Sequence, residues 1–452
     1  MKANVLIHLT IGLLLLGLTT IAGADTFTVD RFDDTTTGAT NCSVYIPNDC
    51  SLRGAIIKAN QTANRSPDAS GDLIYLPAGT YTLTIGGFLE NAAATGDLDI
   101  TEDLQIEGLN SGATIDGNSI DRVFHVLNGA HLQAKNLTIT GGTTLGVPDS
   151  GGGGIMNEAG TLTLTDCTVT GNSTHLDGGG IFNGPSCSSS TNLTTISFNH
   201  ADRDGGGIYN ANSISFYNSI IGGSNTALGN GGGLFTDGSA FLTRTTILAN
   251  ETSNGTGPDS HGAGIFNTDY LELVNCSLVN NWAHDDEGGA IYNDGNLNLT
   301  YVSLRDNFAI SGPAIATGSG AHTTLSSTLI VGFCTNGGGT ITSVGRSLES
   351  PSNTCSLTGP FDQVNITDAM TEVEDFGAGT TIALMQGSPA IDQGDTATCP
   401  DTDQRHVDRP INGDGSPFAY CDIGAYEYHP GQPLFSDGFE DGDTSAWSSQ
   451  TP

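Results

Sequence analysis

The feature that most constrains this fold is a hexapeptide that returns about every 26 residues. Its first clear copy is Gly-Gly-Gly-Ile-Met-Asn at 152–157. Later copies keep small residues, then Ile or Leu, then an aromatic residue, then Asn or Thr, and they begin at 178, 205, 231, 262 and 288. A unit this short cannot bury a hydrophobic face alone, so neighbouring units must stack. The repeat therefore predicts a fold that grows along one axis, in which each unit contacts its neighbours.

A second marker runs in phase with the first, and it consists of an aliphatic residue followed three positions later by Asn. The five copies are Val169 with Asn172, Ile196 with Asn199, Ile247 with Asn250, Leu278 with Asn281, and Leu304 with Asn307. Between the two markers lies a short alternating segment, such as Leu-Thr-Leu-Thr at 162–165. Alternation of this kind indicates a half-buried strand. Each unit therefore holds about three short strands, and it is too short for a propeller blade of about 40 residues.

These patterns predict an all-β fold, a right-handed parallel β-helix with three-strand coils. Neighbouring coils should lie about 4.8 Å apart, and right-handed winding follows the rule for parallel crossovers. The repeated Ile and Leu should form columns inside. The repeated Gly suits positive φ and close backbone approach at a corner, and Asn can bond the Asn of the next coil. We expect these Gly and Asn residues to be structural.

Charge and the N-terminal segment limit the compartment and the partners. The 452 residues include 49 acidic and 13 basic ones, for a net charge of −36, which disfavours nucleic acid and anionic lipid surfaces and favours divalent cations. Residues 1–24 have Lys2, an apolar core at 11–18 and a small-residue cleavage site at 22–24, as in a secretory signal peptide. No later apolar run is long enough to span a membrane. We expect a secreted, monomeric mature chain without a transmembrane segment.

Export permits disulfide bonds, and six of the nine cysteines bracket short loops. The expected pairs are Cys42 with Cys50, Cys334 with Cys355, and Cys399 with Cys421. Cys167 and Cys276 occupy equivalent repeat positions and should point inward as small hydrophobic residues. Because nine is odd, at least one thiol stays unpaired within the chain.

The region before the repeat predicts more coils and a cap. Residues 72–140 continue the strand pattern less regularly. In 51–60 the apolar residues instead fall on one face at helical spacing, with Ser51 as a candidate N-cap. A short helix here would cover the open end of the β-helix, since an uncovered edge invites aggregation.

Several segments resemble modules of bacterial surface proteins. Cys-Ser-Leu-Arg-Gly-Ala at 50–55 resembles the CSLREA-type N-terminal module, with Gly54 in place of the usual acidic residue. The copy at 288–291 and the aromatic and Asn ladder resemble polymorphic outer-membrane protein repeats. Ser-Pro-Ala-Ile-Asp at 388–392 and Cys-Asp-Ile-Gly-Ala-Tyr-Glu at 421–427 resemble the choice-of-anchor Q module. Residues 435–448 resemble a terminal motif on exported proteins of some Gram-negative bacteria.

The resemblance implies a protein that is secreted or held on the outer cell surface of a Gram-negative bacterium. It also implies a C-terminal module that closes the β-helix and precedes a varied anchoring tail. We divide the chain accordingly into a signal peptide (1–24), an N-terminal cap (25–71), a parallel β-helix (72–345), a C-terminal module (346–430) and a flexible tail (431–452).

Fragments of a catalytic site are present, but the set is incomplete. Parallel β-helices often cleave acidic polysaccharides, and hydrolases of this class need clustered Asp residues and a His. Asn-Thr-Asp at 267–269 and Asp285-Asp286 look like two such motifs, but His261 precedes them instead of following them. No Arg-x-Lys pair follows either. Because function must be argued from a full site, we assign no catalytic residue.

A more regular polar row lies four residues before each apolar anchor, and it should stack along one edge of the β-helix. Its members are Asp177, Asp204, Asn230, His261 and Glu287, with Asp202, Asp259, Asp285 and Asp286 close by. Oxygen ligands of this kind could hold Ca²⁺, and the candidate ligands are Asp177, Asp204, Asp286 and Glu287. The alternative is a solvated row of turn residues, where Asp is favoured for local hydrogen bonding.

The sequence therefore favours a non-catalytic exported or cell-surface protein that presents a long, rigid, polar face to glycans or to another surface. Two alternatives stay open. One is a polysaccharide lyase or glycoside hydrolase that acts on acidic polysaccharide. The other is a structural passenger or spacer.

Overall fold

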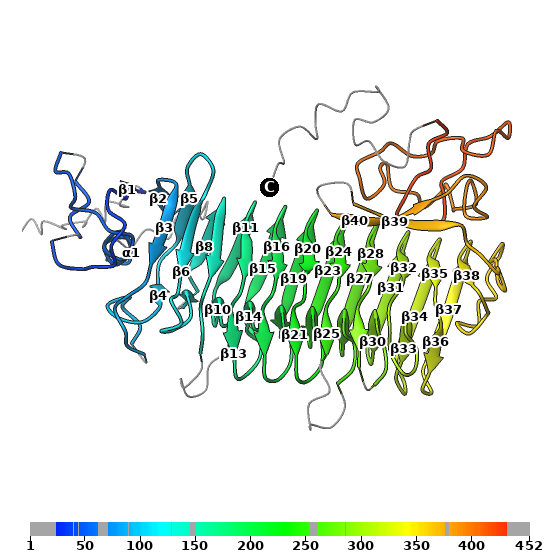
Figure 1. Ribbon diagram of the computed structural model, residues 1–452, viewed down its shortest axis with the longest axis horizontal. Coiled ribbons are helices and arrows are strands. Elements are labelled where there is room, and N and C mark those ends of the chain that lie inside the picture. The colour runs from blue at the N-terminus through cyan, green and yellow to red at the C-terminus, as the bar shows by residue number, and fades with distance from the viewer. Residues whose placement is uncertain are drawn as a thin grey trace, which may run out of the picture.

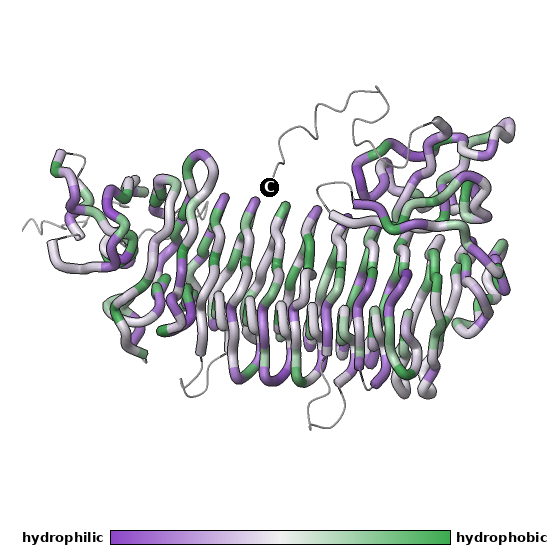
Figure 2. The backbone as a smooth tube through the Cα atoms, in the orientation of Figure 1, coloured by the Kyte–Doolittle hydropathy of each residue, from purple (hydrophilic) through white to green (hydrophobic). Residues whose placement is uncertain are grey.

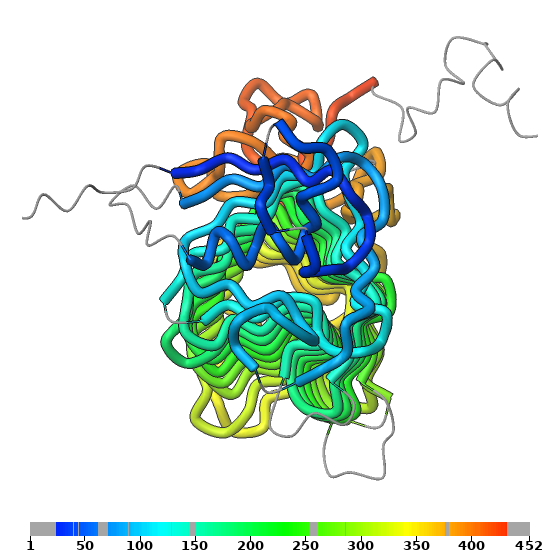
Figure 3. The backbone as a smooth tube through the Cα atoms, turned by 90° about the vertical axis from the view of Figure 1, so that its left-hand side faces the viewer, coloured from blue at the N-terminus to red at the C-terminus, as the bar shows by residue number. Residues whose placement is uncertain are grey.

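The chain forms coils stacked along one axis, a parallel β-helix (Figure 1), and the coils superimpose in the end-on view of Figure 3. The computed structural model describes residues 24–431 apart from 39, 44, 62–70, 89, 128, 145–150, 253–259, 285 and 376–378. The expected signal peptide up to residue 23, the expected tail from 432 onward, Asp259 and Asp285 lie outside the described residues. No helix in the described part of the chain is long and apolar enough to cross a membrane.

The first long sheet, here the broad sheet, has strands of mostly five residues, one from each coil. Its twelve strands are, in spatial order, β1 (Thr26–Thr28), β2 (Asp72–Leu76), β5 (Leu104–Gly108), β8 (His131–Lys135), β11 (Thr161–Thr165), β15 (Ser188–Asn192), β19 (Ser213–Tyr217), β23 (Ser239–Thr243), β27 (Tyr270–Val274), β31 (Asn296–Thr300), β34 (His322–Ser326) and β37 (Thr340–Gly345).

The second sheet, here the ladder sheet, is built from the hexapeptide repeat. Its ten strands are β4 (Leu98–Ile100), β7 (Phe124–Val126), β10 (Ile155–Asn157), β14 (Ile181–Asn183), β18 (Ile208–Asn210), β22 (Leu234–Thr236), β26 (Ile265–Asn267), β30 (Ile291–Asn293), β33 (Ile315–Thr317) and β36 (Cys334–Asn336). The predicted repeat register is confirmed, since Ile155 pairs with Ile181 and Asn157 with Asn183.

The third sheet, here the covered sheet, contains the second marker. Its eleven strands are β3 (Gly79–Thr82), β6 (Ala113–Asp116), β9 (Leu137–Thr140), β12 (Thr168–Thr170), β16 (Thr195–Ser197), β20 (Ile220–Gly222), β24 (Thr246–Leu248), β28 (Ser277–Val279), β32 (Ser303–Arg305), β35 (Leu329–Val331) and β38 (Leu348–Ser350).

Five middle coils add a fourth, two-residue strand that the sequence did not predict. This corner sheet consists of β13 (Ser173–Thr174), β17 (His200–Ala201), β21 (Thr226–Ala227), β25 (Glu251–Thr252) and β29 (Trp282–Ala283). The pairing also extends beyond the predicted limits of 72–345, because β1 joins the broad sheet and β38 joins the covered sheet.

The interior is a continuous column of aliphatic side chains. Ile155, Leu162, Leu164 and Val169 of one coil are fully buried. Most of their equivalents are buried hydrophobic residues too, but Ser189 and Thr191 take the places of Leu162 and Leu164 in the next coil. Hydrophobic and hydrophilic residues are interspersed along the β-helix instead of forming separate blocks (Figure 2). This distribution is expected when each strand buries alternate residues.

Two ladders of buried amides run inside the corners. The first connects Asn157, Asn183, Asn210 and Thr236 and resumes between Asn267 and Asn293. The second connects Asn172, Asn199, Asn225, Asn250, Asn281 and Asn307. Each amide of the second ladder also donates to a backbone carbonyl of the preceding coil. The predicted structural role of Asn is confirmed, and Asn225 is a member that the three-residue spacing missed.

Glycine is needed at this corner of the coil for two separate reasons. The first glycine of a run has positive φ, for example +73° at Gly178. The second allows coils to approach, because a Cβ on Gly179 would lie 2.3 Å from the carbonyl oxygen of Gly206. The predicted reasons for glycine at this corner are thus both present.

The N-terminal cap is held by residues of the Cys-Ser-Leu-Arg segment. Helix α1 (Leu52–Ala59) begins after Ser51, whose hydroxyl accepts from the amide of Gly54, so the predicted helix and N-cap are confirmed. Arg53 is fully buried, pairs with Asp34 at 2.6 Å, and donates to the carbonyls of Ala93, Gly96 and Asp97. The cap therefore fixes the loop that leads into β4.

The C-terminal region closes the β-helix with one segment and covers its side with another. Cys355 and Leu357 pack on the last coil of the core. The chain then folds back, and the antiparallel hairpin of β39 (Thr371–Asp375) and β40 (Thr380–Leu384) lies against β24, β28 and β32 (Figure 1). The resemblance implied a module that closes the β-helix. Most of the module instead lies along the covered sheet.

The six cysteines expected to pair form three disulfides, Cys42–Cys50, Cys334–Cys355 and Cys399–Cys421. The remaining three, Cys167, Cys187 and Cys276, are buried free thiols. Burial raises the pKa of Cys167 to about 11 and that of Cys276 to about 12, so both stay protonated and unreactive at neutral pH.

Candidate functional site

From β11 to β34, the outer face of the broad sheet is a wide polar surface with very little charge, and we call this part the broad face. Its outward positions are mostly Ser, Thr and Asn, and Glu272 is the one carboxylate among them. The strands are in register, so hydroxyl and amide groups repeat at the spacing of neighbouring strands, about 4.8 Å.

Three aromatic side chains lie near the middle of the broad face. Tyr217 and Phe241 are 45% and 37% exposed, and the ring of Phe241 lies 5.7 Å from that of Tyr270. The hydroxyl of Tyr270 donates to Glu272 and accepts from Asn298. The rings therefore lie within a polar network instead of forming an isolated apolar patch.

The outer face of the ladder sheet differs, because its aromatic side chains stack on one another. Phe182, Tyr209, Phe235, Phe266 and Tyr292 form a continuous column with centroids 5.0–5.2 Å apart and interplanar angles of 1–6°. His261 extends the stacking and lies 4.3 Å from Tyr292. The inner rings Tyr209, Phe235 and Phe266 thus each stack on a ring on both sides.

The predicted polar row does stack along the edge of the ladder sheet, but its groups bond one another. Asp177 accepts from the amide of Asp204, Asp204 accepts from the amide of Asn230, and Asn230 accepts from the amide of His261. Arg203 also pairs with Asp177 at 3.3 Å. Burial raises the pKa of Asp177.

The four candidate calcium ligands are divided between two adjacent coils, which carry Asp177 and Asp204, and a coil three turns further along, which carries Asp286 and Glu287. Asp286 pairs with His261 at 3.2 Å, and the backbone carbonyl of Glu287 accepts from Gly262. Among the described residues, this row does not bring three ligand atoms within 4.8 Å of one another. The geometry favours turn residues that bond the next coil.

The hydrolase-like fragments do not converge in the described part of the chain. Asn267 is buried in the inner amide ladder. Asp269 is exposed just after β26, whereas His261 and Asp286 precede β26 and β30. Asp269 thus lies at the opposite end of the strands from the pair formed by His261 and Asp286.

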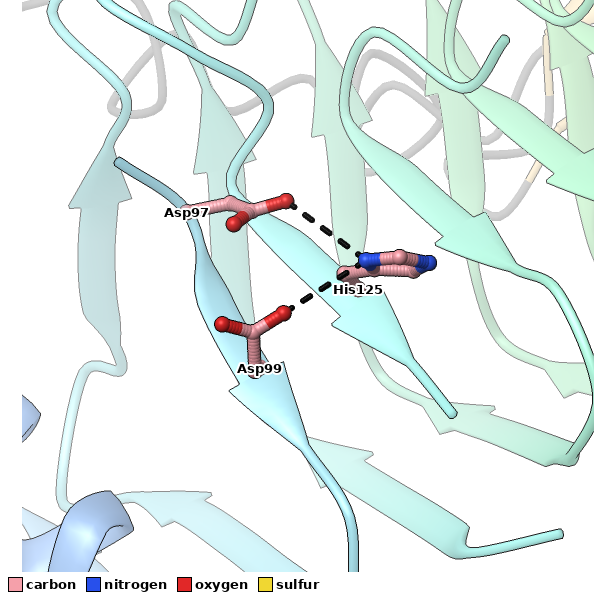
Figure 4. A group of neighbouring side chains, drawn as sticks. All are labelled: Asp97, Asp99 and His125. Atoms are coloured by element: carbon pink, nitrogen blue, oxygen red, sulfur yellow. Dashed lines mark ion pairs between the residues drawn. The ribbon is translucent and has the colours of Figure 1, made fainter. Parts of the chain in front are cut away.

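The structure instead brings together a cluster that the sequence did not single out. Asp97 precedes β4, Asp99 lies within it, and His125 lies on the neighbouring β7, opposite Asp99 (Figure 4). The Nδ1 atom of His125 lies 3.4 Å from Oδ1 of Asp99 and 3.9 Å from Oδ2 of Asp97. The side chains of Asp97 and Asp99 are more than nine-tenths buried, and that of His125 is 11% exposed.

Two further charged groups border this cluster. Nε of Arg122 lies 3.0 Å from Oδ2 of Asp97, and Nε2 of His125 lies 3.0 Å from Oε2 of Glu158. Burial raises the pKa of Asp97 well above its usual range, although the nearby Arg122 opposes this effect. Burial also raises the pKa of Asp121, whose carboxylate accepts from the amide of Arg122.

The fold places this protein in the class of parallel β-helices, which the comparison of structures supports. The chain is similar to the crystal structure of pectate lyase Pel9A, with a TM-score of 0.52 and 12% identity over 91% of this chain and 98% of that chain. A protein described as Geobacillus virus E2 ORF18 gives a TM-score of 0.38 at 10% identity, over 78% of this chain and 68% of that one. No protein-family model and no curated protein sequence matches the chain. At these identities the likeness shows the fold alone.

Proposed function

We propose that this chain is an exported, non-catalytic protein that binds a neutral polysaccharide on the broad face. The observation that carries the proposal is the composition of that face, where hydroxyl and amide groups repeat in register around Tyr217, Phe241 and Tyr270. Sugars present hydroxyls that both donate and accept hydrogen bonds, and Ser, Thr and Asn offer matching groups. Tyrosine adds a large apolar ring with a polar tip.

Charge favours a neutral ligand. With a net charge of −36, the protein repels acidic polymers at long range. The broad face keeps the carboxylates away from the contact area, apart from Glu272. A neutral glycan can therefore dock without desolvating many charges, which is costly when they end unpaired.

Rigidity also supports binding to an extended polymer. Each broad-sheet strand from β2 to β34 pairs on both sides with strands of neighbouring coils, so the outward groups are fixed before binding. Preorganisation lowers the entropic cost of association. The similarity in fold to a pectate lyase supports a carbohydrate polymer as the class of ligand. The three disulfides and the resemblance to surface modules support a position outside the cell.

Co-sedimentation with insoluble cellulose and chitin, and affinity electrophoresis with soluble neutral glucans and with pectate, test the proposal. We expect binding to at least one neutral polymer and no release of unsaturated or reducing-end products. The double variant Tyr217→Ala, Phe241→Ala should weaken binding at least about tenfold, because central aromatic contacts dominate such interfaces.

A matched control is Phe198→Ala, since Phe198 is 63% exposed but follows β16 of the covered sheet instead of lying on the broad face. It should bind like the wild type. Product release would replace this proposal with the enzyme alternative. Neither binding nor product release would favour the structural spacer. Equal loss in the control and the double variant would show that the broad face is not the site.

A further inference from the structure

The cluster of Asp97, Asp99 and His125 has the dimensions of a metal site. Its three ligand atoms, one from each side chain, lie within 4.8 Å of one another. Three ligands that bind a tetrahedral ion at about 2.0–2.2 Å hold their atoms about 3.3–3.6 Å apart. The distances of 3.4 and 3.9 Å from Nδ1 of His125 to the two carboxylates are close to that range. They are long for charge-assisted hydrogen bonds, which are about 2.7–2.9 Å.

A buried oxygen with no hydrogen bond points to a ligand independently. Asp99 is fully buried, and its Oδ1 accepts no hydrogen bond, whereas Oδ2 accepts from the amide of Ala93 at 2.7 Å. The free oxygen faces Nδ1 of His125 (Figure 4). A buried carboxylate oxygen without a partner is costly, and a cation between the two groups would satisfy it.

The orientation of His125 fits the same role. A metal-binding histidine usually donates its second ring N–H to a carboxylate, which fixes the ring and its tautomer. Nε2 of His125 lies 3.0 Å from Glu158, on the adjacent coil. With the proton on Nε2, the lone pair of Nδ1 points toward Asp97 and Asp99.

The surrounding scaffold is rigid. Buried Arg53 donates to the carbonyls of Ala93, Gly96 and Asp97 and pairs with Asp34. The loop that carries Asp97 is thereby tied to the N-terminal cap, and Asp99 and His125 sit on paired strands. Ligands held in this way need little reorganisation to bind an ion.

We propose that Asp97, Asp99 and His125 bind one divalent transition-metal ion, with Zn²⁺ as the representative probe. One imidazole and two carboxylates suit Zn²⁺ better than Ca²⁺, which prefers six to eight oxygen ligands. In their ionised forms, Asp97, Asp99 and Glu158 carry three negative charges, and Arg122 offsets one of them. The local surplus of negative charge thus matches a divalent cation. The site is independent of the broad face.

Isothermal titration of the chelator-treated mature chain with ZnCl₂, together with thermal melting, tests the site. We expect one ion per chain and a higher Tm with Zn²⁺. Both effects should be lost in His125→Gln and in Asp99→Asn. Glu158→Gln keeps all three ligands and changes an exposed side chain, so it should fold normally and bind about 10–100-fold more weakly.

The matched control is His200→Gln, because His200 also pairs with a carboxylate, Asp202, at 3.0 Å, but lies in the corner sheet. It should bind Zn²⁺ like the wild type. No stoichiometric binding by the wild type would overturn the site and leave His125 only as a neighbour of the carboxylates. Unchanged affinity in His125→Gln would overturn it as well. If that variant does not fold, an unchanged affinity in Glu158→Gln decides against the site.

Discussion

The ladder sheet and the broad sheet are built from the same coils, yet their outer faces differ in composition and in the contacts that their side chains make. On the ladder sheet one outward residue per coil recurs as an aromatic ring, and the rings stack with interplanar angles of 1–6°. On the broad face three outward positions per strand vary, mostly among Ser, Thr, Asn and aromatic residues. On the ladder sheet the repeated rings contact one another, whereas on the broad face the varied polar groups can contact a partner.

The contrast follows from what each face leaves unsatisfied. Stacked rings gain about 0.5–1.5 kcal/mol per pair beyond their burial, and only the hydroxyls of Tyr209 and Tyr292 add polar groups to the column. Hydroxyl groups on the broad face bond only in part across strands, for example Ser190 to Thr163 at 3.4 Å. The ladder sheet is therefore a stabilising spine, whereas the broad face is the surface on which we propose binding.

The largest effect on stability should come from a substitution in the glycine corner that leads into the ladder sheet. In Gly206→Ala, the new Cβ would lie 2.4 Å from backbone atoms of Thr226 and 2.5 Å from the carbonyl oxygen of Gly232. Because backbone cannot yield as a flexible side chain does, the free energy of unfolding should fall by about 3 kcal/mol. Ser215→Ala on the broad face should change it by less than about 0.5 kcal/mol. Urea denaturation of both variants checks this, and similar losses would contradict the contrast.

The covered sheet supplies the next test, because its outer face is closed by the C-terminal module. Glu427 of the module is fully buried beside Arg409, at 3.2 Å, and also faces Asp422 and Asp403. Burial raises the pKa of Glu427 to about 7, against an ordinary value of 4.5, although Arg409 opposes the shift. Burial and Glu427 also raise the pKa of Asp422.

A carboxyl whose pKa is raised in the folded state stabilises that state below its unfolded pKa, and this stability is lost as pH rises through the folded pKa. The module should therefore dock more firmly near about pH 5 than near about pH 8, by an amount of the order of 2 kcal/mol. Hydrogen exchange of β39 and β40 at the two pH values measures this. Glu427→Gln should flatten the dependence. Equal or stronger protection at the higher pH would contradict it.

How far the sequence predicted these features depends on whether they repeat. The coils, both amide ladders and the glycine corners follow from residues that return at a fixed interval. The sequence pattern missed Asn225 because this residue follows Ile221 by four residues instead of three. The corner sheet escaped because a two-residue strand is too short to show alternation. The three disulfides followed from cysteines that bracket loops.

The sequence did not predict the cluster of Asp97, Asp99 and His125 or the position of the C-terminal module, and the reason is different. Asp97, Asp99 and His125 lie in early coils that lack the hexapeptide, so nothing in the sequence aligns β4 with β7. The module's position depends on contacts far apart in the chain, such as Gln404 with Ser277 at 2.6 Å and Tyr301 with Asp395 at 2.6 Å. A sequence motif can indicate the type of module, but it does not indicate which distant residues of the chain the module packs against.

A smaller effect should separate the two aromatic groups directly. Tyr209→Ala removes a ring stacked on both Phe182 and Phe235, so stability should fall by about 1–3 kcal/mol while polysaccharide binding is unchanged. Phe241→Ala should do the reverse, weakening binding with little change in stability. Thermal melting and co-sedimentation of the two variants give both readouts. Loss of binding in Tyr209→Ala would move the binding surface to the ladder sheet.

The smallest effect concerns the polar row beside the spine. Oδ1 of Asp204 accepts from the amide and the side chain of Asn230, at 2.7 and 3.2 Å, and an asparagine oxygen can replace it. Asp204→Asn should therefore change stability by less than about 0.5 kcal/mol. Calcium binding at this row stays a prediction that the same variant tests. If the row acts only in turns, Ca²⁺ should shift the Tm of neither protein, nor that of the control Asp269→Asn, an exposed acid outside the row. A Ca²⁺-dependent rise that Asp204→Asn alone abolishes would make the row a calcium site and give the spine a second role.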